Sequence, residues 1–247
     1  MENAQLVSLS RQIALQRQMD VVANNMANIT TTGFKASDLM FEDFLMPVAK
    51  DNDFGGTDRN VHYTQDWSTV HDMSAGAIEQ TGSELDVALM GDGFLTVQTA
   101  DGPRYTRSGA LAIDATGVLV DLNGNPVLGS SGPIKFDDSD VDIVVGQDGT
   151  VSTNNGTKGK LAIAEFVDQQ ILTREGDNYF GGPAPDAPVA TRVMQGSIER
   201  SNVSGVTELT TMIRVQRAYQ SLANLMQKQD AAPPFSASAR SGPKETI

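Results

Sequence analysis

Two long segments at opposite ends of the chain lack internal proline and glycine and carry apolar residues at helical spacing. The first extends from Glu2 to Ile29, and its three-and-four spacing is interrupted by one stutter after Ile13. Gly33 follows the Thr30–Thr32 run, and glycine readily adopts the left-handed conformation of a helix C-cap. We therefore predict a helix over residues 2–29 with an apolar stripe formed by Leu6, Leu9, Ile13, Leu15, Met19, Val22, Met26 and Ile29.

The C-terminal segment has the more regular pattern. Ser204-Gly205-Val206 leads into it and Pro233-Pro234 stops it, which predicts a helix over about residues 202–230. At 1.5 Å per residue this helix is roughly 40 Å long, and a helix of this kind needs a partner for its apolar face. Two adjoining stripes make that face wide: Leu209, Met212, Gln216, Tyr219, Ala223 and Met226, then Val215, Ala218, Leu222 and Leu225.

The middle of the chain changes to the pattern of short strands and tight turns. Apolar runs such as 85–89, 93–98, 111–113, 118–120 and 161–166 are separated by turn dipeptides. Asn123-Gly124, Asp148-Gly149 and Asn155-Gly156 are typical hairpin turns, because these residues reach positive φ easily. We predict an all-β region over about residues 80–197.

These patterns together predict an α+β fold. Two long terminal helices pack as an antiparallel, coiled-coil-like pair, and an all-β domain is inserted between them. The expected parts are an N-terminal helical segment 1–35, an extended and poorly packed connector 36–80, a β domain 81–197, a C-terminal helix 198–230 and a flexible Ser/Pro-rich tail 231–247.

Charge and composition exclude several classes of function. The net charge is −13, and residues 36–100 hold two basic and twelve acidic residues, so a nucleic acid is not expected as a partner. Without cysteine there is no disulfide, thiolate nucleophile or Cys-ligated zinc. No apolar run is long enough to span a bilayer, and the first residues lack the pattern of a cleaved signal peptide.

The candidate sites for chemistry are weak. Residues 121–125 begin like a calcium-binding loop, but Pro126 replaces the glycine that such a loop requires, so a plain hairpin turn is favoured. The acidic run 137–142 clusters four carboxylates that could hold a cation loosely, but such a charge run is usually a solvated surface. We expect no catalytic residue, no metal and no cofactor, although an acidic soluble enzyme built on the β domain stays open as an alternative.

Three stretches resemble the bacterial flagellar rod and hook proteins. Ala23 to Lys35 (ANNMANITTTGFK) resembles the N-terminal signature, and Gln195 to Tyr219 resembles the C-terminal one. Between them, Leu85-Asp86-Val87-Ala88, Gly93-Phe94 and Tyr105-Thr106-Arg107 resemble the family's β domain. The resemblance covers most of the chain in the expected order.

The resemblance implies a structural, non-enzymatic rod subunit. The length leaves no room for the outer domain of a hook protein, and the opening segment favours the F type of the proximal rod over the G type of the distal rod. The implied partners are other rod subunits and the flagellar type III export apparatus, without membrane insertion. The implied location is the basal-body rod, which crosses the periplasm and transmits torque.

The resemblance also implies that the helical ends form the inner, assembling layer. The expected N-terminal interface residues are Leu6, Leu9, Ile13, Leu15, Met19, Val22, Asn24, Asn25, Met26, Asn28, Ile29, Gly33 and Phe34. The expected C-terminal ones are Val206, Leu209, Met212, Ile213, Gln216, Tyr219, Leu222, Ala223, Leu225 and Met226. For Asn24, Asn25 and Asn28 two roles stay open: capping the helix or binding neighbouring chains.

Overall fold

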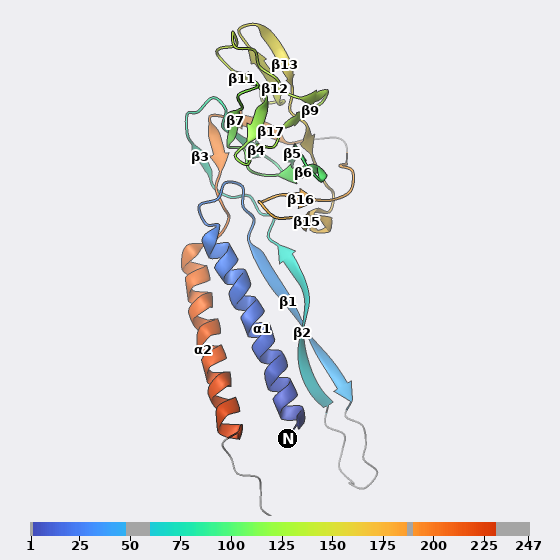
Figure 1. Ribbon diagram of the computed structural model, residues 1–247, viewed down its shortest axis with the longest axis vertical. Helices are drawn as coiled ribbons and strands as arrows, with labels where there is room; N and C mark the ends of the chain where they lie inside the picture. The colour runs from blue at the N-terminus through green and yellow to red at the C-terminus, as the bar shows by residue number, and fades with distance from the viewer. Residues whose placement is uncertain (1, 48–59, 187–189, 231–247) are drawn as a thin grey trace, which may run out of the picture.

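The computed structural model describes residues 2–47, 60–186 and 190–230. A β domain occupies one end of the molecule, and two helices and a long hairpin extend away from it (Figure 1). The helices are α1 (Glu2–Ala27) and α2 (Gly205–Asp230), and the hairpin strands are β1 (Ser37–Pro47) and β2 (Asn60–His71). Two helices around a β-rich middle confirm the predicted α+β class.

The two helices lie side by side and run in opposite directions (Figure 1). Two side-chain contacts fix this orientation. The Asn25 amide donates to Glu208 near one end of the pair (3.2 Å), and the Gln12 amide donates to the Tyr219 hydroxyl further along it (2.8 Å). Helix α1 ends at Ala27, two residues earlier than expected, because Asn28 to Thr31 form a turn.

The segment 36–80 differs from the predicted connector. Strands β1 and β2 pair antiparallel from Ser37–His71 to Pro47–Asn60, with one register shift between Met40 and Phe41. Helix α1 lies between α2 and this hairpin (Figure 1). The Gly- and Asp-rich stretch within 36–80 suggested an extended and poorly packed connector, but the flanking residues satisfy their backbone groups by pairing with each other.

The described residues 78–186 and 190–199 form the β domain, built from short antiparallel strands. The largest sheet has the order β14-β5-β6-β16-β15, a second has β11-β12-β13, and the remaining strands form the pairs β4–β17, β3–β18, β7–β8 and β9–β10. The strands in the first half are β3 (Ile78–Gln80), β4 (Val87–Met90), β5 (Phe94–Thr99), β6 (Gly102–Thr106), β7 (Leu111–Ile113), β8 (Leu119–Asp121), β9 (Leu128–Gly129) and β10 (Gly132–Pro133). The second half contains β11 (Val144–Val145), β12 (Thr150–Thr153), β13 (Gly156–Lys160), β14 (Ile163–Ala164), a 3-10 turn η1 (Gln169–Ile171), β15 (Thr173–Arg174), β16 (Phe180–Gly181), β17 (Arg192–Gln195) and β18 (Ser197–Glu199).

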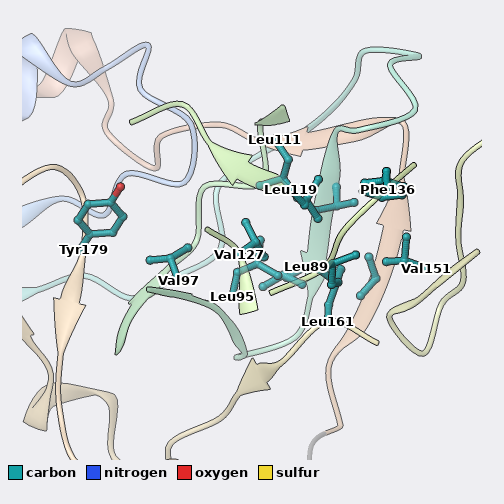
Figure 2. Packing of buried hydrophobic residues seen from close by; sticks show 13 residues of the cluster. Leu89, Leu95, Val97, Leu111, Leu119, Val127, Phe136, Val151, Leu161 and Tyr179 are labelled. Atoms are coloured by element: carbon teal, nitrogen blue, oxygen red, sulfur yellow. The ribbon is translucent and has the colours of Figure 1, made fainter. Parts of the chain in front are cut away.

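Two clusters of buried side chains hold this domain together. The larger one contains aliphatic residues from many strands, among them Leu95, Val97 and Val127, while Tyr179 lies at its margin (Figure 2). The smaller one is aromatic: Phe94 contacts Phe180 edge-on with ring centroids 5.8 Å apart. This second cluster faces the helical part, because its residues touch the side chains of the junction described below.

The expected hairpin turns are confirmed. Gly124, Gly149 and Gly156 all have positive φ, between 82° and 114°. In the described part of the chain, neither helix has the length and apolarity needed to cross a membrane.

Candidate assembly site: helix faces and a buried junction

Helix α2 packs one of its sides against α1. Val215 is buried there, and Met212, Tyr219, Leu222, Ala223 and Met226 are half-buried. These positions recur at intervals of three and four residues, so they form one stripe of the helix. This stripe therefore has a partner inside the chain.

A second side of α2 is apolar and faces solvent. Val206, Leu209 and Ile213 are 81%, 51% and 44% exposed, and they recur at intervals of three and four residues. We call these three residues the outer stripe. Gln216 and Leu225 are also exposed, with Leu225 on the opposite flank of the helix. The single wide face expected from the sequence is thus divided between an internal contact and an open surface.

The predicted residues of α1 divide in the same way. Val22 is buried, and Leu15, Met19, Met26 and Ile29 are half-buried, whereas Leu9 and Ile13 are exposed. The side chain of Leu6 lies outside the described set. Most of the α1 stripe therefore packs inside the chain, against α2 and the hairpin, and a shorter part is open.

Two of the three asparagines act within the chain. The buried Asn25 amide exchanges two hydrogen bonds with the backbone of Ser37, at 2.9 and 3.0 Å, and so links α1 to β1. Asn28 donates to the Asn24 carbonyl at 2.9 Å and closes the last turn of the helix. Asn24 is exposed, and with Asn28 it lines a cavity of about 360 Å³ between α1 and the β domain.

A buried cluster of charges lies where the helices meet the β domain. Lys35, Glu199 and Arg107 are 1%, 2% and 4% exposed. The Lys35 ammonium donates to the Glu199 carboxylate and to the Ser74 carbonyl, both at 2.6 Å. Arg107 Nε lies 3.1 Å from the second Glu199 oxygen, where the charges attract without the alignment of a hydrogen bond. We call Lys35, Arg107 and Glu199 the charge cluster.

The partners of the charge cluster come from several segments. The Gly76 N–H donates to the Glu199 carboxylate at 2.9 Å. Arg107 donates to the carbonyls of Gly91, at 2.8 Å, and Gly93. Burial lowers the pKa of both Lys35 and Arg107, because desolvation disfavours their charged forms.

A second arginine ties the loop after α1 to the β domain. Arg174 on β15 donates to the Lys35 carbonyl at 2.7 Å, and its guanidinium lies 4.2 Å from the ring centre of Phe34. The Asn178 amide donates to the Thr32 carbonyl at 3.0 Å. Phe34, expected to contact neighbouring chains, is instead buried under this arginine.

Gly33 allows the loop and the β domain to approach each other closely. Its φ is +65°, and a Cβ at this position would lie 2.3 Å from the Arg107 carbonyl carbon. Its N–H donates to the Glu199 carbonyl at 2.7 Å. Gly33 was expected to cap the helix; its observed role is to bring the N-terminal loop against β18 and against the segment that directly follows β6.

Comparison with known proteins identifies the family. Residues 6–35 match the description "Flagella basal body rod protein", residues 88–153 match the "Flagellar hook protein FlgE/F/G D1 domain", and residues 194–231 match the "Flagellar basal body rod FlgEFG protein C-terminal". The flagellar basal-body rod protein FlgF of Caulobacter vibrioides is 37% identical over 92% of this chain and 93% of its own length. The chain belongs to the flagellar basal-body rod protein family.

Other relatives include rod proteins of both the F type and the G type. The FlgF protein of Mesorhizobium japonicum is 31% identical over 92% of this chain and 93% of its own length. The rod protein FlgG of Bacillus subtilis is 32% identical over 87% of this chain and 90% of its own length. This rod protein is thus a structural subunit of the flagellar basal body and not an enzyme, as the sequence resemblance implied.

The charge cluster of the rod protein draws on all three matched segments. Lys35 belongs to the N-terminal match, Arg107 to the D1 match and Glu199 to the C-terminal match. All three residues stand in the motifs that carried the resemblance, but none was expected to act in a site. A sequence motif identifies a residue by its neighbours along the chain. Whether three such residues contact one another in a buried cluster depends on the tertiary fold.

The two weak candidates for cation binding have internal explanations. The buried carboxylate of Asp121 accepts the N–H groups of Asn123 and Asn125, at 3.0 and 2.9 Å, and the hydroxyl of Tyr179. In the acidic run, Asp137 and Asp140 pair with Lys158. Residues 121–126 therefore form a turn whose polar groups satisfy one another, in agreement with the hairpin interpretation.

Proposed function

We propose that this rod protein is a subunit of the proximal rod and assembles with neighbouring rod subunits through its terminal helices. The observation that carries the proposal is the outer stripe: a soluble monomer gains nothing from three apolar residues aligned on one exposed helix side. Burying residues of this size stabilises a contact by about 1.5–3 kcal/mol each. Contacts repeated with a helical offset propagate instead of closing as a dimer.

In this arrangement α1 and α2 form the inner tube, and the β domains form an outer layer. The inner part would comprise residues 1–35 and 198–230, joined by the β1–β2 hairpin, with residues 81–197 as the outer part. The three-and-four spacing of the α2 stripe that packs on α1 supports a coiled-coil-like pair. A tube of such helices would act as the shaft that transmits torque. We further propose that the subunit reaches the rod through the flagellar type III export apparatus.

The outer stripe can be tested by one substitution with a matched control. Ile213→Asp places a carboxylate in the proposed contact, where an unpaired buried charge costs several kcal/mol. Asn224→Asp adds the same charge at an exposed polar position of the same helix. Cells expressing the first variant are expected to export the protein but to leave rods incomplete and not to swim, while the control swims normally. Normal motility with Ile213→Asp would refute assembly through this stripe.

The G type of the distal rod is the second candidate, supported by the similarity to FlgG proteins. Gold labelling of an epitope-tagged chain in isolated basal bodies separates the two positions. Label at the membrane-proximal part of the rod supports the F type, and label along the distal part supports the G type.

A further inference from the structure

The β domain is connected to the helical part by two single crossings of the chain. Residues 72–77 lead from β2 into β3, and residues 200–204 lead from β18 into α2. A body held at two points is free to rock about the line through them. A fixed orientation therefore requires at least one further contact away from that line.

The loop between α1 and β1, residues 28–36, supplies this contact, and the charge cluster fastens it. Lys35 of the loop binds Ser74 of the first crossing and Glu199, the last residue of β18, which directly precedes the second crossing. Glu199 also accepts from Gly76 of the first crossing, and it attracts Arg107 of the β domain. One carboxylate at the end of β18 thus joins the loop, the first crossing and the β domain.

A neutral side chain, Asn202, also links the loop to the two crossings. The Asn202 amide of the second crossing donates to the Asp72 carbonyl at 2.8 Å, and its oxygen accepts from the Ala36 N–H at 2.7 Å. The loop and the first crossing are therefore linked twice, once by charged groups and once by an amide.

Burial of the charge cluster costs free energy of desolvation, so the cluster is a poor source of stability. Two cations and one anion are removed from water, and Arg107 satisfies part of its charge with the Gly91 and Gly93 carbonyls. Desolvation of buried ions often cancels the gain from pairing, so apolar replacements can match such a cluster in stability. A buried charge tolerates few arrangements of its partners, so it restricts the geometry of the groups around it. Neutral side chains in the same places impose no such restriction.

We propose that the charge cluster is an orientation lock that holds the β domain at a single angle to α1, α2 and the hairpin. The cluster selects this angle more than it stabilises the fold. A role of this lock in transmitting torque between the helical inner part and the outer β domains rests on the proposed rod function. The lock itself is a property of the single chain.

The test measures the angle directly in the isolated protein. The chain has no cysteine, so Asn224→Cys on α2 and Thr157→Cys on β13, both exposed, can carry spin labels in an otherwise unreactive background. Pulsed electron-spin resonance then gives the distribution of distances between the helix and the β domain. With the native cluster we expect one narrow peak.

Two variants separate orientation from stability. Glu199→Gln leaves two buried cations without an anion, and we expect a lower thermal midpoint. The neutral triple variant Lys35→Met, Arg107→Gln, Glu199→Gln removes every charge of the cluster but keeps an acceptor for Gly76. We expect it to regain a midpoint near that of the native protein while losing the single peak in favour of a broad or divided distribution.

The exposed ion pair Arg200–Glu79, at 3.3 Å, provides the control. Arg200→Gln with Glu79→Gln should leave the narrow peak unchanged, because both groups are more than half exposed. A narrow peak in the folded triple variant would overturn the proposal. So would loss of amide protection in the β-domain strands of that variant, since the cluster would then be part of the domain's own core. The distance measurement needs no rod, so failure of the rod assignment would not affect it.

Discussion

At the scale of single residues, the junction depends on a glycine that leaves room for a close approach and on a short chain of polar side chains. The N-terminal loop reaches the backbone of Arg107, directly after β6, only because Gly33 has no Cβ. Ser37, at the start of β1, lies in a short polar chain: Arg174 contacts its hydroxyl at 3.3 Å, and the hydroxyl lies 3.1 Å from His71 Nδ1. Both features lead to predictions about individual side chains.

Gly33→Ala should destabilise the protein far more than Gly82→Ala. Both glycines have positive φ, +65° and +75°, so both variants bear the cost of about 1–2 kcal/mol for a left-handed alanine. At Gly82 nothing lies within 4 Å of the new Cβ, whereas at Gly33 it would overlap the Arg107 backbone. We expect an additional loss of about 1–3 kcal/mol at Gly33. Urea unfolding measures the difference, and equal losses would contradict the close approach.

His71 should make stability depend on pH in mildly acidic solution. Burial, together with the charge of Arg174, lowers its pKa from 6.5 to about 4 in the folded protein. Between these values the unfolded chain binds a proton that the folded one does not, so stability rises with pH across this range and falls on acidification.

The comparison that isolates this effect uses His71→Gln. The imidazole is only partly buried, so we expect it to contribute about 1–2 kcal/mol of the change, less than the full shift in pKa implies. The difference in unfolding free energy between the native protein and the variant should change between pH 4 and 6.5 and be constant above that range. A constant difference throughout would show that His71 titrates normally.

At the scale of elements, each terminal helix has a packed side and an exposed side. The inner side of α2 pairs with α1, and the outer stripe is open. Helix α1 is the more enclosed of the two, because α2 covers one flank and the hairpin covers another (Figure 1). The hairpin thus completes the packing of the helical part and is more than a link to the β domain.

Charges on the two sides of α2 should therefore act differently in the isolated protein. Val215→Asp introduces a carboxylate into the buried contact with α1 and should reduce helix stability by several kcal/mol. Leu209→Asp on the outer stripe should change stability by about 0.5 kcal/mol or less. Circular dichroism during thermal unfolding distinguishes the two. Equal destabilisation would mean that the outer stripe also packs inside the chain.

At the scale of the whole molecule, the rod protein has two parts with separate packing. The β domain has its own aliphatic and aromatic clusters, and the helical part relies on the contacts among α1, α2 and the hairpin. Between them lies the buried junction rather than a flexible linker. A subunit built in this way can present helices to one set of neighbours while its β domain keeps a defined direction.

Local sequence determined the helices and the tight turns. Apolar residues at three-and-four spacing, bounded by glycine and proline, predicted α1 and α2 to within a few residues, and Asn-Gly and Asp-Gly predicted three turns. These signals lie within a few neighbouring residues, so they can be read without knowledge of the fold. The motifs around Lys35, Arg107 and Glu199 indicated the family for the same reason.

Tertiary structure alone decided the hairpin, the division of the α2 face and the charge cluster. Strands β1 and β2 pair across a polar stretch, and pairing of distant segments leaves no local period to detect. Lys35 and Glu199 are 164 residues apart, and charged residues are normally solvated, so their sequence context predicts exposure. They are buried because the fold brings each one a partner of opposite charge or a carbonyl, which no single segment contains.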